Sequence, residues 1–167
     1  MKFWMKIGLP LMLALAAGHA AAADYKIGVV DTERILRDSA PAVNASKKLE
    51  KEFAGRKQEV DKLTSQIKDA QAVLDKEGPT MAESTRHAKE HDLDGMTSKL
   101  QQMQREFREA LNLRKNEELV TVLGLANKAI QQIAESEKYD LILQEAAYRN
   151  PRIDITDKVI QYLDNEK

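Results

Sequence analysis

The sequence predicts a mainly α-helical protein in which a long antiparallel helical hairpin is inserted into a small α/β body. Apolar residues recur at steps of three and four over residues 49–74 and 93–110, the a/d spacing of a coiled-coil seam. The two stripes are near mirror images about residue 80, beside Gly78-Pro79, where we expect the chain to turn. Short β-rich segments lie only near the two ends, which places the hairpin between them.

The first 23 residues are typical of a secretory signal peptide. Lys2 and Lys6 accompany an apolar run of about ten residues, too short to span a bilayer, and small residues fit cleavage near Ala23. An uncleaved membrane anchor is the alternative, and the small residues argue against it. We therefore expect export and a mature chain of 144 residues, 167 less 23.

The mature chain opens with residues 25–30, which alternate and are β-rich, so they predict a strand. Asp31 is a good cap for a short helical turn through Leu36. A helix over residues 42–77 follows, with Pro41 tolerated in its first turn, and about 36 residues give it a length of roughly 54 Å.

The return helix is predicted over residues 83–137. Its apolar register changes near residues 114–118, where we expect the arm to meet the body. Beyond that point a new stripe is formed by Leu119, Leu123, Ala126, Ile130 and Ile133.

A second strand is predicted over residues 139–143 and a short third strand over 152–155, after a turn around Pro151. Thr156 is the expected cap of a final helix. The predicted organisation is a signal peptide (1–23), a body (24–41 and 119–167) and a hairpin arm (42–118) with its tip near residues 78–82.

A body with so few strands is marginal by itself, so we expect it to be an oligomerisation domain. The candidate residues for self-association are Ile27, Val29, Leu141 and Leu143.

The arm offers two kinds of apolar residue. The predicted seam residues are Phe53, Val60, Leu63, Ile67, Leu93, Leu100 and Phe107, with Phe53 facing Phe107, and Arg56 falling on the seam opposite Met103. Other apolar side chains and the methionines form a second, adaptable surface, because exposed apolar patches mark interaction sites and methionine suits unspecific contact. The candidates for contact with a client are Val73, Met81, Met96, Met103, Leu111 and Leu113. Val120 and Val122 are off the seam, and we favour packing against the body for both.

Composition excludes several classes of function. Without Lys2 and Lys6 the chain has 24 basic and 27 acidic residues, a net charge of −3, which does not favour nucleic acid. There is no cysteine, and no phosphate loop or nucleophile elbow, so we expect no catalytic residue, cofactor or metal site. His87 and His91 share an i, i+4 spacing that would suit a metal ion, but no third ligand is indicated, and a pH-sensitive tip is the favoured alternative.

Several segments in order resemble the periplasmic chaperone family Skp, also called OmpH. These are residues 26–31, residues 49–56 at the start of the outgoing arm, Asn116-Glu117-Glu118, and residues 139–143 followed by 154–160. The resemblance implies a jellyfish-like homotrimer, with a β-rich body joining three hairpins around a cavity. It also implies that unfolded outer-membrane proteins are held there without ATP in the periplasm and passed to the outer-membrane assembly machinery.

The charge of this chain departs from the best-known members of that family, which are strongly basic and attract acidic clients and lipopolysaccharide. Residues 68–99 contain five basic and seven acidic side chains, and the family's lipopolysaccharide site has no matching positions here. We therefore expect peripheral contact with membrane or lipopolysaccharide to be disfavoured, and apolar contact to dominate client binding.

Two hypotheses of function follow. The first is an ATP-independent holdase for unfolded outer-membrane proteins. The second is a periplasmic structural or adaptor protein that binds a folded partner through the hairpin tip. A spacer needs a regular seam, whereas this chain has arginines in the seam and scattered methionines, which favours the holdase.

Overall fold

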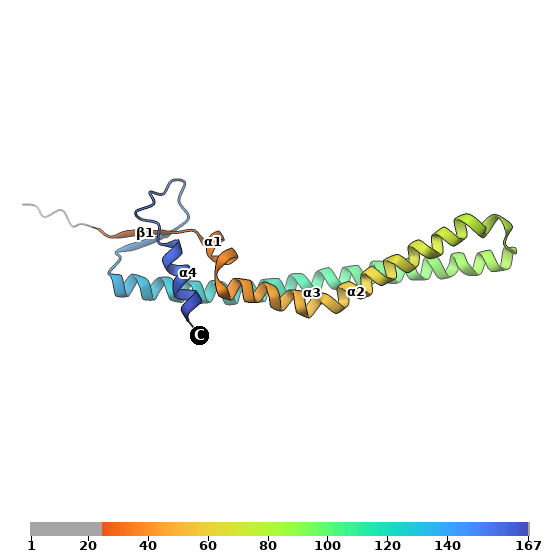
Figure 1. Ribbon diagram of the computed structural model, residues 1–167, viewed down its shortest axis with the longest axis horizontal. Helices are drawn as coiled ribbons and strands as arrows, with labels where there is room; N and C mark the ends of the chain where they lie inside the picture. The colour runs from red at the N-terminus through yellow and green to blue at the C-terminus, as the bar shows by residue number, and fades with distance from the viewer. Residues whose placement is uncertain (1–24, 167) are drawn as a thin grey trace, which may run out of the picture.

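The computed structural model describes residues 25–166, so the predicted signal peptide and its cleavage point lie outside the described residues. A long arm of two antiparallel helices projects from a small body (Figure 1). The elements in chain order are β1 (Ile27–Val30), α1 (Thr32–Asp38), α2 (Ala40–Glu77), a 3₁₀ turn η1 (Gly78–Thr80), α3 (Glu83–Glu137), β2 (Leu141–Gln144) and α4 (Thr156–Asn165). The predicted fold class, helical arm plus small α/β body, is confirmed.

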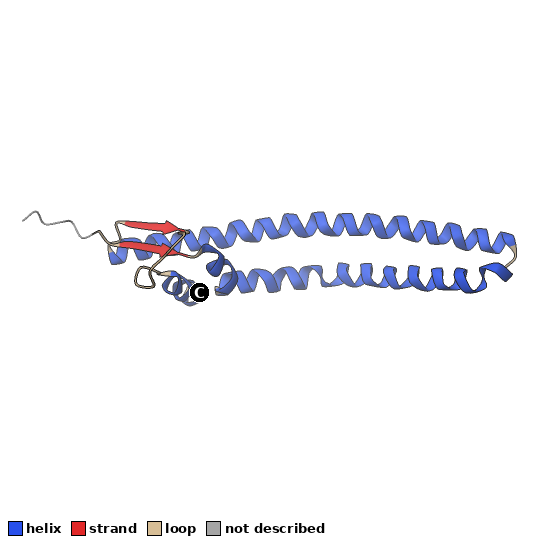
Figure 2. Cartoon of the chain, turned by 90° about the horizontal axis from the view of Figure 1, so that it is seen from above, coloured by secondary structure: helices blue, strands red, loops and turns tan. Residues whose placement is uncertain are grey.

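Two helices of unequal length build the arm. α2 has 38 residues and α3 has 55, so at about 1.5 Å per residue they extend roughly 57 and 83 Å. They run side by side from the body to the tip in both views (Figures 1 and 2). The extra length of α3 passes under the body. There its buried residues recur at steps of three and four: Val122, Ala126, Ala129 and Ile133.

The turn at the tip differs from the one expected. Gly78 has φ −50°, a right-handed conformation that any residue adopts, so the reversal does not use the glycine's freedom. Pro79 lies in η1, and the N–H of Met81 donates to the carbonyl of Gly78 at 3.2 Å. The missing N–H of proline and this 3₁₀ bond therefore end α2.

The body is built around a two-stranded parallel sheet that rests on one end of α3 (Figure 2). β1 and β2 pair with Ile27 opposite Leu141 and Val29 opposite Leu143. Helices α1, α3 and α4 enclose the hydrophobic core against one face of this sheet. The buried core residues are Val30, Ile35, Ala126, Ala129, Ile133, Ile155, Val159 and Leu163.

The predicted third strand is wrong. Residues 151–153 form a turn, and only Asp154 bridges to Val29. Pro151 starts this turn, so the segment touches β1 through two backbone bonds of Val29 without extending the sheet. The expected short turn after β1 is instead a seven-residue helix, α1, capped by Asp31, whose carboxylate accepts from the N–H of Arg34 at 3.0 Å.

Thr156 does not cap α4, because Ile155 is the cap residue and makes no side-chain cap bond. Thr156 is fully buried, and its hydroxyl accepts from the N–H of Asp31 at 2.9 Å and donates to the carboxylate of Asp154 at 2.5 Å. Because this buried hydroxyl both donates and accepts a hydrogen bond, it holds the start of α1 against the start of α4.

The stripe predicted beyond residue 118 is shifted by one position at its start. Val122 is buried, as expected for packing against the body, whereas Leu119 is exposed. The same packing predicted for Val120 is wrong, because its side chain is 70% exposed. Ala126 and Ile133 are buried as expected, and Leu123 and Ile130 are half-buried. In residues 25–166 no helix has the length and apolarity needed to cross a membrane.

Candidate functional site: apolar hollows along the arm

An apolar hollow lies at the base of the arm, between α2 and α3, and we call it the arm-base groove. It has a volume of about 540 Å³. Phe53 and Phe107 line it, with ring centroids 5.7 Å apart and ring planes at 90°, an edge-to-face contact. This is the contact that the mirror pattern predicts. The other apolar lining residues are Leu49, Ala54 and Leu111.

The groove is open because a two-helix arm covers only one stripe of each helix. Phe53 and Leu63 are buried, whereas the remaining seam residues are only half-buried: Val60, Ile67, Leu93, Leu100 and Phe107. In a larger bundle a third helix would cover these flanks. Apolar surface along the seam therefore stays available to another molecule.

The groove continues toward the body. A second hollow of about 180 Å³ shares Ser46, Leu49 and Lys115 with it and adds Leu36, Leu119 and Val122. The two hollows together make an apolar path from the arm to the outside of the body core. Leu119, displaced from the core stripe, lies on this path.

Two hollows that are smaller than the arm-base groove lie further out along the arm. One, of about 280 Å³, joins Ala70 and Val73 of α2 with Met96 of α3. Another, of about 250 Å³, places Arg56 beside Met103. Arg56 is exposed, and its guanidinium carbon lies 5.7 Å from the ring centroid of Phe53, so its charged end rests on the outer side of the seam aromatic.

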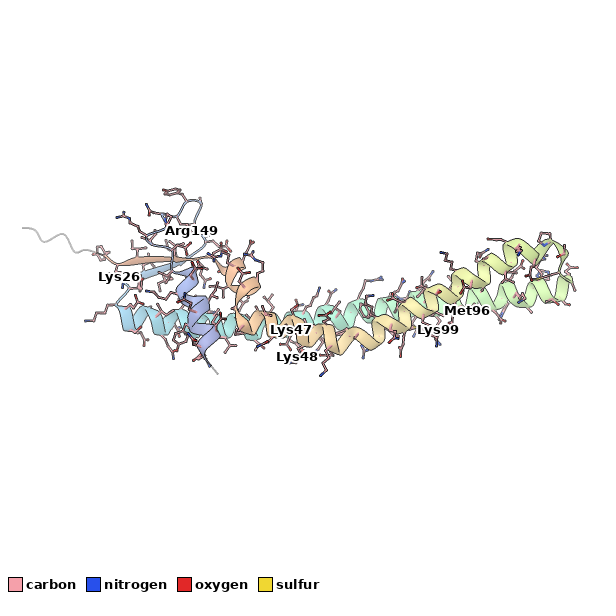
Figure 3. All side chains as sticks on the ribbon, viewed as in Figure 1. Lys26, Lys47, Lys48, Met96, Lys99 and Arg149 are labelled. Atoms are coloured by element: carbon pink, nitrogen blue, oxygen red, sulfur yellow. The ribbon has the colours of Figure 1, made fainter. Side chains whose placement is uncertain are left out.

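An ion-pair cluster beside the groove ties α2 to α3. Arg114 contacts Glu52 of α2 at 3.2 Å, and Lys48 of α2 contacts Glu118 at 2.6 Å. Hydrogen bonds from Arg114 to Glu52 and then Glu117 raise the pKa of Arg114. The hydrogen bond from Lys48 lowers the pKa of Glu118. Lys47 and Lys48 lie on α2 close to the body, whereas Met96 and Lys99 lie far out on α3 (Figure 3). The cluster marks the place where the predicted seam register changes.

The predicted client-contact residues fall in different places. Leu111 lines the arm-base groove, Met103 the hollow beside Arg56, and Val73 and Met96 share the outer hollow. Met81 lines a cleft at the tip. Leu113 is 61% exposed on α3 and lines none of these hollows.

The predicted self-association residues share one face of the sheet. Their register puts Ile27, Val29, Leu141 and Leu143 on the face opposite the core. Ile27, Leu141 and Leu143 are 40%, 48% and 42% exposed. Val29 is already buried within its own chain, and the segment at 153–155 also bonds to both of its backbone groups.

His87 and His91 do not come together with other ligands. His87 lies 3.3 Å from Glu90 and 3.7 Å from Glu83, and within residues 25–166 no group of three or more His, Cys, Asp or Glu side chains is placed to hold a metal ion.

A model of the family described as outer membrane protein (OmpH-like) matches residues 26–163. The chain belongs to this OmpH-like family. Among its relatives, the chaperone protein Skp of Pectobacterium atrosepticum is 30% identical and that of Yersinia enterocolitica 29% identical, each over 96% of this chain and 98% of the relative. These relatives are named as chaperones, a non-enzymatic family, in keeping with the lack of catalytic motifs in the sequence.

The fold is also shared with a solved structure. A putative OmpH-like outer membrane chaperone from Caulobacter crescentus CB15 superposes with a TM-score of 0.68 at 18% identity, covering 98% of this chain and 90% of that one. At that identity the likeness concerns the fold alone. The resemblance seen in the sequence is thus confirmed as membership of the OmpH-like family.

Sequence reasoning missed two features of this OmpH-like arm. It treated Leu49, Phe53 and Phe107 as seam only, although their outer flanks line the arm-base groove. It also left Ala54 out, an exposed alanine at the groove edge. A signal was present: an arm of only two helices must leave both flanks of its seam uncovered.

Proposed function

We propose that this OmpH-like protein is an ATP-independent periplasmic holdase that binds unfolded outer-membrane proteins, prevents their aggregation and passes them to the outer-membrane assembly machinery. The observation that supports this most is the open apolar path at the arm base, about 540 Å³ in its main part, which the chain leaves unfilled. The names of the relatives point the same way.

The physical argument concerns the client. An unfolded β-barrel protein exposes alternating apolar residues and unpaired strand edges, which aggregate in water. Shallow, half-open hollows provide many weak contacts with no deep, specific pocket. Such contacts shield the client and still allow its release without nucleotide.

We further propose that three copies associate through the body. In this proposal the body comprises residues 24–41 and 119–167, and the arm comprises residues 42–118. The exposed face of the sheet formed by Ile27, Leu141 and Leu143 supports this, since a two-stranded sheet with an apolar outer face is marginal alone. Within residues 25–166 the far edge of β2 has no strand partner, so its backbone groups also stay open to a second copy.

Leu143→Asp tests the assembly. It places a charge on the exposed sheet face, and we expect light scattering after size-exclusion chromatography to find a monomer where the unchanged protein is a trimer. Val120→Asp, also at an exposed apolar residue, should leave the mass unchanged. An unchanged mass for Leu143→Asp would contradict the proposed interface.

Holdase function is tested by diluting a urea-unfolded outer-membrane protein into the mature protein without nucleotide. We expect stoichiometric suppression of turbidity. Ala54→Glu adds a charge at the edge of the arm-base groove and should weaken suppression, whereas Ala72→Glu, at another exposed alanine of α2 outside the hollows described, should not. If an intact assembly leaves the client to precipitate, the holdase proposal is wrong and an adaptor for a folded partner takes its place.

A further inference from the structure

The tip of the arm contains a cleft unlike the other hollows. It has a volume of about 630 Å³ and lies between the last turns of α2 and the first turns of α3. Leu74, Met81 and Leu93 provide its apolar surface, and each is half-buried. Carboxylates stand around them: Asp75, Glu83, Glu90 and Asp94. Arg86 is the cation among the lining residues.

Arg86 does not neutralise this cleft. Its guanidinium is occupied by Glu90, at 2.8 Å. Among the side chains of residues 25–166, Asp75 accepts a hydrogen bond only from the uncharged Gln71 amide, at 2.8 Å. Across residues 25–166, neither Asp75 nor Asp94 has a cationic side chain within salt-bridge distance. Two carboxylates therefore retain their full attraction for an external cation.

Backbone dipoles do not decide the sign of the charge in this cleft, because the carbonyl end of α2 and the N–H end of α3 meet at the tip. Asp75 lies in the last turn of α2, where the carbonyl end of the helix carries partial negative charge. The opposite end, the N-terminus of α3, begins at Glu83, and Asp94 lies three turns beyond it, outside the reach of that dipole. The arm-base groove differs from the tip cleft, because it is lined by Lys57 and Lys115 as well as by Glu50 and Asp61. We therefore expect it to prefer neither positively nor negatively charged ligands.

We propose that the tip cleft binds a cationic, amphipathic segment of an extended polypeptide. A lysine or arginine head lies against Asp75 and Asp94, while its alkyl stem and a neighbouring apolar side chain pack on Leu74, Met81 and Leu93. Charge complementarity selects the segment, and the apolar floor distinguishes it from a simple polycation. This inference goes beyond the proposed holdase activity and does not depend on it.

The test measures fluorescence anisotropy of labelled peptides with the mature protein at low salt. The probes have equal length and alternate Lys with Leu, Lys with Ser, or Glu with Leu. We expect the Lys–Leu peptide to bind about tenfold more tightly than either of the others, since only it uses both charge and apolar contact. The resonance of the Met81 methyl group should shift as it binds.

The double variant Asp75→Asn/Asp94→Asn keeps side-chain shape and removes both charges. We expect it to weaken Lys–Leu binding by about fivefold to tenfold, the range of two exposed charge contacts. Glu109→Gln/Glu135→Gln changes net charge equally at exposed positions of α3 away from the cleft and should leave binding within about twofold.

Equal weakening by the two double variants would overturn the proposal, because attraction would then follow net charge and not the tip. Equal binding of the Glu–Leu peptide would overturn it too, because apolar contact alone would suffice. Turbidity measured with the unchanged protein separates the two proposals. Selective binding of the Lys–Leu peptide without client protection counts against the holdase only, whereas client protection without selective binding of the Lys–Leu peptide counts against the tip cleft only.

Discussion

Replacing Phe53 with alanine tests whether the arm depends on its aromatic contact. Phe53 is 5% exposed and meets Phe107 edge to face. Truncating a buried phenylalanine costs about 3–5 kcal/mol, and an aromatic pair contributes about 0.5–1.5 kcal/mol of this beyond its area. Because Phe107 is only half-buried and one side of the site is open, we expect a loss of about 3 kcal/mol, the lower end of the range.

The assay combines urea unfolding with amide hydrogen exchange, because a long arm can open while the body stays folded. We expect faster exchange in α2 and α3 around residues 50–60 and 100–110, with the body core around Val159 unchanged. Leu113→Ala is the control: this side chain is 61% exposed, so its truncation should change stability by no more than about 0.5 kcal/mol.

A double-mutant cycle with Phe107→Ala isolates the ring contact. The expected coupling is about 0.5–1.5 kcal/mol. Coupling near zero, or a loss for Phe53→Ala below about 1 kcal/mol, would refute the argument that this pair anchors the two helices.

Three further changes test the body. Hydrogen bonds from Lys158 and then Lys26 lower the pKa of Glu137, so the stability that its carboxylate contributes is present above the unfolded-state pKa and is lost as pH falls through the lower folded-state pKa. Glu137→Gln should therefore reduce the fall in Tm between neutral and acidic pH, and an unchanged fall would contradict this. Gly28→Ala would bring a Cβ within 3.1 Å of Ile155 and 3.2 Å of the Tyr139 ring, so we expect a loss of about 1–3 kcal/mol, and a Tm equal to the parent would show that these neighbours yield freely. Ser39→Ala removes a fully buried hydroxyl that has no hydrogen-bond partner within residues 25–166, so urea unfolding should find stability unchanged or raised by about 1 kcal/mol. A clear loss of stability would mean that the hydroxyl is satisfied in solution.

The arm could be predicted from the sequence because its information is local. Steps of three and four residues specify which side of each helix is apolar, and the mirror about residue 80 pairs Phe53 with Phe107. The return helix has the predicted bounds, 83–137. The body was harder, since Leu119 and Val122 are both apolar and only the position of α1, α4 and the sheet decides which one is buried.

The roles of single polar residues also needed the structure. Threonine is a residue type that often caps helices, but the hydroxyl of Thr156 instead accepts a hydrogen bond from the N–H of Asp31, 125 positions away in sequence. At the tip, the sequence indicates an excess of acidic residues but not which of them is neutralised. That depends on side-chain distances, which pair Arg86 with Glu90 and leave Asp75 and Asp94 facing the cleft.

The sequence by itself thus determined the family, the long hairpin and the place of its turn, because periodicity and chain order are properties of neighbours along the chain. Tertiary structure decided which apolar flanks stay open, which face of the sheet is exposed, and which charges remain uncompensated. These depend on contacts between α2 and α3, or between β1 and β2, whose residues are tens to more than a hundred positions apart. The proposed client path and the tip cleft are both surfaces that only the tertiary structure decides.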